Sequence, residues 1–301
     1  MELSVIMPVY NAEQYVEKAI ESVLQQSFPN FEFIIINDGS KDNSLSIINS
    51  FSDSRIIVID QENLGLAKTL NIGLKTAKGR YVARMDADDI CYPMRFQKQL
   101  DFLNKNPDVK LLGSTVERID KDGNTITYDI PYTQHDVLKK IIFKYGNPFK
   151  HPTIVMDRVL AIKLGGYNEL INKYFEDYFL WSQFCRHSKV AILPEALLRY
   201  RITPGSIMSS AADSRFIDFM LKIINKGSFD YSDREEMLSL KRTQQQSITK
   251  EGALDTYAER IDKEKRHLSS RITNFFVRCL SVNFAILLLS FAKNIASKII
   301  K

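Results

Sequence analysis

The sequence predicts an α/β fold in which helices cover both faces of a mainly parallel sheet. Short apolar, strand-like runs alternate with helical patterns through residues 3–103, and this alternation is typical of parallel strands joined by crossover helices. Polar loops follow four of the predicted strands, at residues 8–11, 38–40, 63–65 and 86–89. Because ligands bind beyond the carboxyl ends of the strands in such sheets, we expect these loops to meet at one edge of the sheet.

Each predicted strand is a short apolar run closed by turn-forming residues, and each predicted helix carries apolar residues at helical spacing. The second strand is apolar along most of its length, which indicates burial on both faces of the sheet. Gly79 follows the third helix, where glycine commonly ends one. The expected strands are residues 3–9, 31–36, 55–60, 81–85, 109–120 and 193–202, and the expected helices are residues 11–25, 44–51, 64–77 and 93–103.

Composition limits the class of protein. A chain of 301 residues with 45% hydrophobic residues can bury one large core and still carry an appendage. The three cysteines lack any CxxC spacing, which argues against a disulfide framework or a structural zinc site. The net charge of +5 equals the charge of residues 271–301, which hold five cations and no acid. The rest of the chain is therefore close to neutral, which disfavours nucleic acid as a partner.

Three carboxylates, Asp86, Asp88 and Asp89, follow the strand predicted at residues 81–85 directly. Two carboxylates one residue apart can hold Mg²⁺ or Mn²⁺, which takes further ligands from phosphate oxygens. Neither a GxGxxG nor a GxxxxGK[ST] motif is present, so a metal on these carboxylates would serve to hold a diphosphate. The alternative is that Asp88 or Asp89 caps the helix expected after Pro93.

Two further residues at loop positions are candidates for the site. Asp38 ends the second strand, where a carboxylate can accept hydrogen bonds from a ribose hydroxyl or a base N–H; the alternative is a turn residue before Gly39. His151 lies in a loop-like segment, residues 147–153, and can reach a metal, a diphosphate or an acceptor. A structural role is its alternative.

Three charged residues of the second half are also candidates. Glu176 and Asp177 are flanked by large aromatic and aliphatic residues, and a carboxylate in such surroundings is suited to removing a proton from a hydroxyl group. The alternative is an acidic pair favoured by the dipole at a helix N-terminus. Arg201 can close over phosphates, with residues 203–206 as a mobile lid; the alternative is a surface arginine.

These motifs together resemble family 2 glycosyltransferases of the bacterial O-antigen and capsular polysaccharide type, which have the GT-A fold, a Rossmann-like, mainly parallel sheet with flanking helices. The matching segments follow the order of the family and run from residue 4 to residue 177. They are residues 4–11, 37–42, 63–67, 79–89, 165–167 and 176–177.

The resemblance implies a role for each matching residue. Asp86 and Asp88 would form the DxD motif that holds Mn²⁺ or Mg²⁺, with Asp89 supporting them. Asp177 would be the catalytic base, with Glu176 beside it on the acceptor side. Outside the matching segments, we expect Trp181 and His151 on the acceptor side, His151 also as a candidate metal ligand, and Arg201 at a phosphate lid. The residues expected to bind the nucleotide sugar are Pro8, Val9, Tyr10, Asp38, Asn63, Gly65, Arg84, Asp86, Ala87 and Asp88.

The implied reaction is the inverting transfer of one hexosyl or N-acetylhexosaminyl group to a hydroxyl. A UDP-sugar is the expected donor and a thymidine diphosphate sugar its rival. The QxxRW motif of processive members is absent, so we expect one sugar to be transferred per encounter. Two other classes remain. A nucleotidyltransferase would show a Gly- and Arg-rich loop after the first strand, and a catalytically silent sugar-nucleotide-binding or scaffold protein would keep the fold and lose the base.

The expected domain organisation is a GT-A domain at 1–205, with a nucleotide-sugar half at 1–105 and an acceptor half at 106–205. A helical extension at 206–268 and a basic amphipathic helix at 269–301 follow. The longest uncharged run of the tail, residues 279–292, has 14 residues, short of the roughly 20 needed to span a bilayer.

We expect the tail, through residues 271–301, to lie on a membrane surface with its cations on anionic headgroups. Packing on the protein's own body, or on a second copy in a homodimer, is the alternative. The N-terminus has no signal-peptide pattern. We therefore expect a cytoplasmic protein, peripheral on the inner face of the bacterial cell membrane, that meets a lipid-linked saccharide acceptor there.

Overall fold

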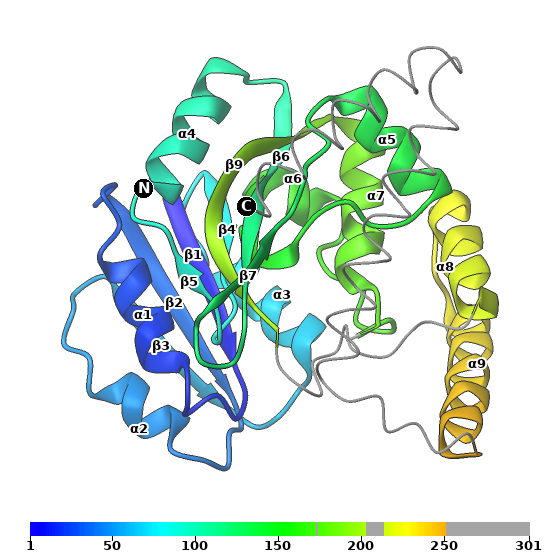
Figure 1. Cartoon of the computed structure of the whole chain (residues 1–301), viewed down its shortest axis with the longest axis horizontal. Coiled ribbons are helices and arrows are strands. Elements are labelled where there is room, and N and C mark those ends of the chain that lie inside the picture. The colour runs from blue at the N-terminus through cyan, green and yellow to red at the C-terminus, as the bar shows by residue number, and fades with distance from the viewer. Residues whose placement is uncertain (173, 203–213, 251–301) are drawn as a thin grey trace, which may run out of the picture. The chain divides into compact units, whose positions relative to one another are not determined.

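The computed structural model describes residues 1–172, 174–202 and 214–250 (Figure 1). The expected lid at 203–206 and the expected membrane helix at 269–301 lie outside the described residues. The chain divides into two compact units, residues 1–244 and residues 245–301. The sheet and the candidate site residues belong to the first unit.

The strands of the described residues form one sheet of nine, in the order β3-β2-β1-β4-β8-β6-β9-β5, with β7 paired to β6. They are β1 (Leu3–Val9), β2 (Phe31–Asp38), β3 (Ile56–Gln61), β4 (Tyr81–Arg84), β5 (Ile90–Cys91), β6 (Val109–Ile119), β7 (Thr125–Tyr128), β8 (Val155–Asp157) and β9 (Lys189–Arg201). The pairs among β1 to β4 are parallel, as is β6 with β9. β8 runs antiparallel to both β4 and β6.

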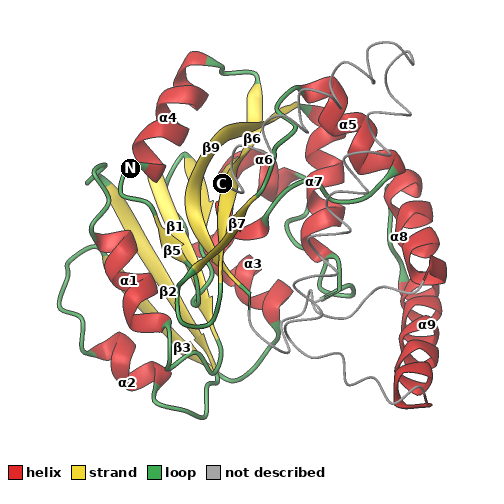
Figure 2. Cartoon of the chain, in the orientation of Figure 1, coloured by secondary structure: helices red, strands yellow, loops and turns green. Residues whose placement is uncertain are grey.

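Helices cover both faces of this sheet (Figure 2). They are α1 (Val16–Leu24), α2 (Ser44–Asn49), α3 (Leu66–Thr76), α4 (Arg95–Lys105), α5 (His135–Lys144), α6 (Arg158–Lys163), α7 (Glu176–His187), α8 (Ser214–Lys226) and α9 (Tyr231–Lys250), with a short 3-10 helix η1 (His151–Thr153). Successive side chains of β1 point to opposite faces of the sheet and so belong to two different parts of the core. Leu3, Val5 and Met7 pack with α1 and α4, whereas Ile6 belongs to the core beneath α3 and α7.

The parallel half of the sheet agrees with the sequence prediction, and the second half adds elements that it omitted. β8 has only three residues and follows η1, so no alternation of apolar and polar residues can reveal it. α1 also begins later than expected, at Val16. Asn11 adopts φ 49°, a left-handed conformation that a helix cannot contain. The predicted fold class, a mainly parallel sheet with flanking helices, is therefore confirmed, and the antiparallel pairs lie in the second half of the sheet.

The helical extension is present in the described residues as α8 and α9. Phe216, Phe219 and Ile223 of α8 are buried in the same core as α7, so α8 belongs with the sheet domain. The two compact units divide after residue 244, and the domain boundaries at residues 205 and 268 stay predictions.

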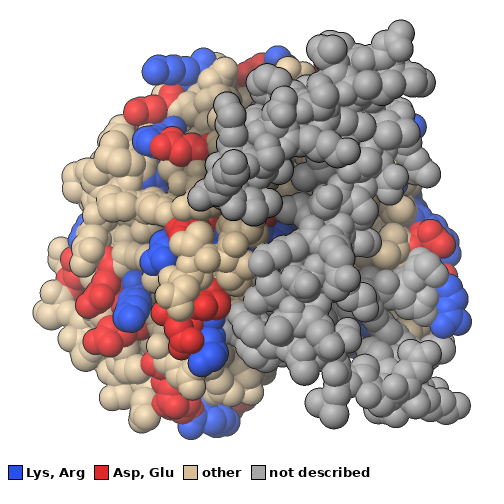
Figure 3. Space-filling view, viewed as in Figure 1, with Lys and Arg blue, Asp and Glu red and all other residues tan. Residues whose placement is uncertain are grey.

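Within the described ranges, every helix is too short or too polar to cross a bilayer. Figure 3 shows Lys and Arg side chains interspersed with Asp and Glu side chains over the described part of the face in view.

Candidate active site

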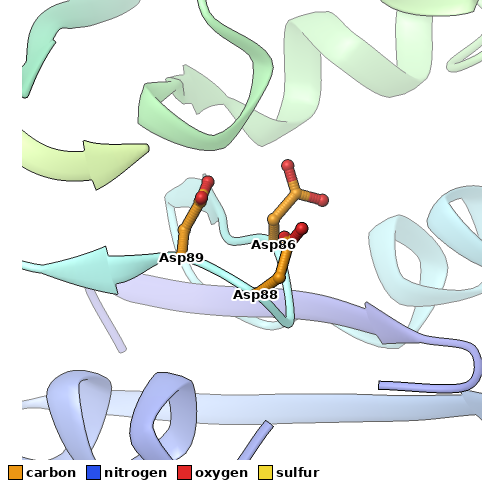
Figure 4. Close-up of side chains that lie close together, drawn as sticks. All are labelled: Asp86, Asp88 and Asp89. Carbon is orange, nitrogen blue, oxygen red and sulfur yellow. The ribbon is translucent and has the colours of Figure 1, made fainter. Parts of the chain in front are cut away.

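The acidic cluster lies in the loop between β4 and β5. The ligand atoms of Asp86, Asp88 and Asp89 lie within 4.8 Å of one another, and their side chains point to the same side of the loop, away from β1 (Figure 4). Helix α4 begins only at Arg95, and its N-cap is Met94 without a side-chain hydrogen bond. The alternative that Asp88 or Asp89 caps this helix is therefore wrong.

The pKa values of Asp88 and Asp89 reflect their burial and the charges beside them. Burial, with a contribution from Asp86, raises the pKa of Asp88 to about 6. Burial and the charges of Asp88 and Asp86 raise the pKa of Asp89 well above its ordinary value. Oδ2 of Asp89 is buried with no hydrogen-bond donor among the described residues. Clustered hard oxygen atoms with an unused buried acceptor fit a divalent cation such as Mg²⁺ or Mn²⁺.

Arg84 is the last residue of β4, directly before the acidic cluster in the chain, and is only 3% exposed. It forms an ion pair with the Asp86 carboxylate. Burial is the largest single effect and opposes its charge, but Asp86, with smaller contributions from Tyr167 and Asp89, raises the pKa of Arg84 overall. Its charge also acts on Glu176 and Asp177, where it lowers the pKa against the effect of burial. Arg84 therefore interacts electrostatically with both acidic groups of the site.

Glu176 and Asp177 form the first turn of α7, so they do lie at a helix N-terminus. Glu176 is buried, and Asp177 is half-buried. Burial raises the pKa of both carboxyls, and the neighbouring Asp177 raises that of Glu176 further. Asp177 also accepts a hydrogen bond of 2.9 Å from the Asn147 side chain, which lies in the loop after α5. Sequence reasoning missed Asn147, because nothing in its spacing from Asp177 signals the contact.

The carboxylate of Asp38 joins two loops at the ends of β2 and β3. Its oxygens accept the main-chain N–H groups of Leu64 at 2.8 Å and Gly65 at 3.0 Å, and the Gln61 side chain at 2.8 Å. Gly65 adopts φ 84°, and a Cβ there would lie 2.9 Å from the Asn172 side chain. Asp38 thus holds the loop of residues 63–65, a positioning contact that neither sequence interpretation included.

The remaining predicted donor residues differ in accessibility. At the end of β1, Val9 is fully buried, whereas Tyr10 is 53% exposed. Ala87 is buried and Asn63 is exposed. Val9 therefore contributes through its backbone or not at all, while Pro8, Tyr10 and Asn63 keep side-chain surface at the edge of the sheet.

His151 and Trp181 lie in an aromatic cluster with Tyr167. Nε2 of His151 is 3.0 Å from the Tyr167 hydroxyl, and the His151 and Trp181 rings are 5.7 Å apart. Burial, assisted by Arg84, lowers the pKa of His151 well below its ordinary value. Among the described residues, the acidic cluster that could hold a metal does not include His151.

Trp181 is 0% exposed, so its side chain cannot line the acceptor side as expected. Eight of the residues of α7 are buried, because the helix is enclosed on most of its sides. Apolar spacing in an enclosed helix does not distinguish core residues from cleft residues.

Arg201 is buried, which excludes the alternative of a surface arginine. Its guanidinium donates to the main-chain oxygens of Asp88, Asp120 and Lys121, and it stacks on the Tyr15 ring at 4.4 Å. Its contacts are thus with the loop that carries the acidic cluster and with the β6–β7 turn.

A mixed sheet of this order, with an acidic loop at the carboxyl end of β4, defines the GT-A class of glycosyltransferase folds. The chain belongs to glycosyltransferase family 2, since the family model described as Glycosyl transferase family 2 matches residues 4–165.

Relatives agree with this assignment. An uncharacterized glycosyltransferase of Haemophilus influenzae is 39% identical over 66% of this chain and 65% of its own length. The amylovoran biosynthesis glycosyltransferase AmsE of Erwinia amylovora is 34% identical over 66% of this chain and 75% of its own. The O-antigen biosynthesis glycosyltransferase WbnJ of Escherichia coli is 33% identical over 69% of this chain and 83% of its own length.

The fold is also that of a solved structure, S. aureus TarS 1-349 in complex with UDP-GlcNAc. The TM-score is 0.62 at 20% identity, covering 92% of this chain and 81% of that one. This likeness shows a shared fold.

Proposed function

We propose that the protein transfers one sugar from a nucleotide-sugar donor to a hydroxyl of a saccharide acceptor, with inversion at the anomeric carbon. The observation that carries the proposal is the position of Arg84. This buried cation is ion-paired with Asp86 of the cluster that fits a metal, and its charge also acts on the Glu176 and Asp177 carboxyls, the pair that fits a base. The groups proposed for both halves of the displacement therefore interact with the last residue of β4.

The proposed reaction is a single displacement. Asp177 accepts the proton of the acceptor hydroxyl, and the oxygen forms a bond to the anomeric carbon. The bond between the anomeric carbon and the diphosphate oxygen breaks, and its electron pair leaves with the nucleoside diphosphate. A divalent ion held by Asp86 and Asp88 would supply positive charge to the diphosphate. Arg84 keeps Asp86 in place and favours the charged form of Asp177.

A UDP-sugar is the proposed donor, carrying a hexose or an N-acetylhexosamine. The TarS complex that shares this fold contains UDP-GlcNAc, which supports a uridine nucleotide. Tyr10, exposed at the end of β1, and the loop that Asp38 holds are the proposed contacts to the nucleotide.

The proposed acceptor is a lipid-linked saccharide of surface polysaccharide synthesis. Its support is the naming of relatives for amylovoran and O-antigen biosynthesis. The basic, apolar segment 271–301 would hold the protein on the inner face of the cell membrane, where such an acceptor is found. Flotation with anionic liposomes tests this part. Equal transfer to soluble and lipid-linked acceptors, together with no flotation, would reject the lipid-linked acceptor and the membrane association.

The central test is donor turnover across a panel of nucleotide sugars with Mn²⁺ or Mg²⁺, comparing wild type with Asp177→Asn. We expect one donor to turn over only with metal, a product of inverted anomeric configuration by NMR, and loss of transfer in the variant with donor binding retained. Normal transfer by Asp177→Asn would reject the base. Donor binding without turnover by wild type would favour the silent scaffold protein.

A further inference from the structure

The geometry points to Asn147 as a positioning residue that orients the Asp177 carboxylate and favours its charged form during transfer. The inference rests on the proposed function, since it assumes that Asp177 is the base. Asn147 belongs to the loop between α5 and η1, so the contact joins two elements that are separate in the chain. Its Nδ2 donates to Oδ2 of Asp177 at 2.9 Å.

The orientation of the Asn147 amide is fixed by its own loop. Its Oδ1 accepts the main-chain N–H of Phe149 at 3.0 Å, and Phe149 is buried in the core shared with α7. With the oxygen used in this way, the NH₂ group must face Asp177, because an amide carries its donors on the other arm. The loop therefore presents a donor to the carboxylate and cannot present an acceptor without breaking its turn.

The second oxygen of the base is held from the other side. Oδ1 of Asp177 accepts the main-chain N–H of Tyr178 at 2.6 Å. One hydrogen bond on each oxygen fixes the plane of the carboxylate and leaves lone pairs for the proton of an acceptor. Of these two donors, only the Asn147 amide can be removed by a side-chain substitution.

The surrounding charges explain why such a donor is needed. Burial disfavours the charged carboxylate, and Arg84 opposes this effect. The titratable groups that interact with Asp177 are Arg84 from β4, Glu176 and Tyr178 from α7, and Tyr167 from the loop after α6. A hydrogen bond to the charged form stabilises it. Asn147 gives this bond to Asp177 and not to Glu176, which selects Asp177 as the ionised member of the pair.

The test is the pH profile of kcat for Asn147→Ala and Asn147→Asp, with the full chain and the donor identified for wild type. Asn147→Asp retains an oxygen for the Phe149 N–H and replaces the donor with a second carboxylate. The matched control is Asn104→Ala, which removes a 3.1 Å hydrogen bond from an exposed asparagine to Glu2. This control removes the same kind of hydrogen bond, from an asparagine amide to a carboxylate, at a position outside the site.

We expect kcat near neutral pH to fall about 10- to 100-fold in Asn147→Ala, as for loss of a hydrogen bond to a charged group, with donor KM nearly unchanged. The acid limb of the kcat–pH profile should move to higher pH in both variants, and further in Asn147→Asp than in Asn147→Ala. At pH values above the shifted limb, kcat should recover toward that of wild type. Asn104→Ala should match wild type.

An acid limb that stays in place in both variants, with kcat lowered equally at every pH or not at all, would overturn the inference. Failure of the proposed function is distinguishable, because then wild type turns over no donor or Asp177→Asn transfers normally.

Discussion

The guanidinium of Arg201 donates a 2.7 Å hydrogen bond to the main-chain oxygen of Asp88, and its main-chain N–H donates to the Asp89 carboxylate at 2.7 Å. The end of β9 thus holds the loop of the acidic cluster by its backbone and by one of its side chains. Nη1 of the same arginine donates to the carbonyls of Asp120 and Lys121 at 2.9 Å. A residue expected to bind phosphates therefore fixes the geometry of the proposed metal site.

The substitution Arg201→Lys should weaken metal use. Lysine keeps the charge but cannot reach three carbonyls with the fork of a guanidinium. We expect the apparent KM for Mn²⁺ to rise about tenfold, with a smaller change in kcat at saturating Mn²⁺. Titration of activity with Mn²⁺ measures both. Arg55→Lys is the control, since Arg55 also stacks on a ring and donates to a carbonyl, away from the site. A rise in donor KM alone would instead support a phosphate-binding role.

The substitution Asp88→Asn should stabilise the metal-free protein at pH 7 and abolish stabilisation by Mn²⁺. The folded pKa of Asp88, about 6, exceeds its ordinary value of 3.8. Between these values the folded state binds more protons than the unfolded state, so stability falls as pH rises through this window. Because asparagine does not titrate, the variant does not lose stability through this group as the pH rises. Thermal unfolding with EDTA and with Mn²⁺, at pH 4 and pH 7, measures it. An Asp88→Asn protein whose Tm falls at pH 7 in EDTA would contradict the prediction.

The substitution Asp38→Asn should raise donor KM more than it lowers kcat. One arm of asparagine is a donor, so it cannot accept the N–H groups of both Leu64 and Gly65, and the loop of residues 63–65 is released. We expect a rise of about tenfold, as for loss of a hydrogen bond to a charged group, measured by steady-state kinetics over donor concentration. Asp101→Asn, which alters an exposed carboxylate bonded to Gln97, should leave KM unchanged. Equal KM values in the two variants would mean that the loop does not contact the donor.

Substitutions of Trp181 should change stability rather than acceptor binding. Because the side chain is fully buried, Trp181→Ala should lower the free energy of unfolding by about 3–5 kcal/mol. Trp181→Phe should fold and keep the acceptor KM of wild type. Urea unfolding and acceptor titration measure the two effects. A large rise in acceptor KM for Trp181→Phe, with stability kept, would return Trp181 to the acceptor side.

The parallel half of the fold could be predicted because its signals are local. Strand-like runs, helical spacing and turn residues place β1 to β4 correctly, and the position of the acidic loop follows from β4. β8 could not be predicted, since it has three residues and its place between β4 and β6 depends on pairing across long stretches of chain. The sheet order of the second half is a tertiary property that no short window contains.

The candidate site could likewise be predicted only where its signals are local in the sequence. Asp86 and Asp88 carry a local motif, and the structure brings them together with Asp89 as expected. The supporting contacts, Asn147 to Asp177 and Arg201 to Asp88, join residues that are distant in sequence and have no spacing rule. Burial also bears on two interpretations: Trp181 lies in the core rather than on the acceptor side, and the surface alternative for Arg201 is excluded. The burial of Arg201 could not be predicted, because arginine is mostly exposed and is buried only where it finds partners.

The position of Trp181 has a practical consequence. It is the one tryptophan of the chain, its ring packs against His151 and Tyr167, and it lies one helical turn after Asp177 in α7. Indole emission from this protein therefore has a single, water-excluded origin beside the proposed catalytic carboxylate. Changes in its intensity or wavelength on adding metal, nucleotide or acceptor would report on the first turns of α7 without any attached dye, and the same signal would follow unfolding of the core.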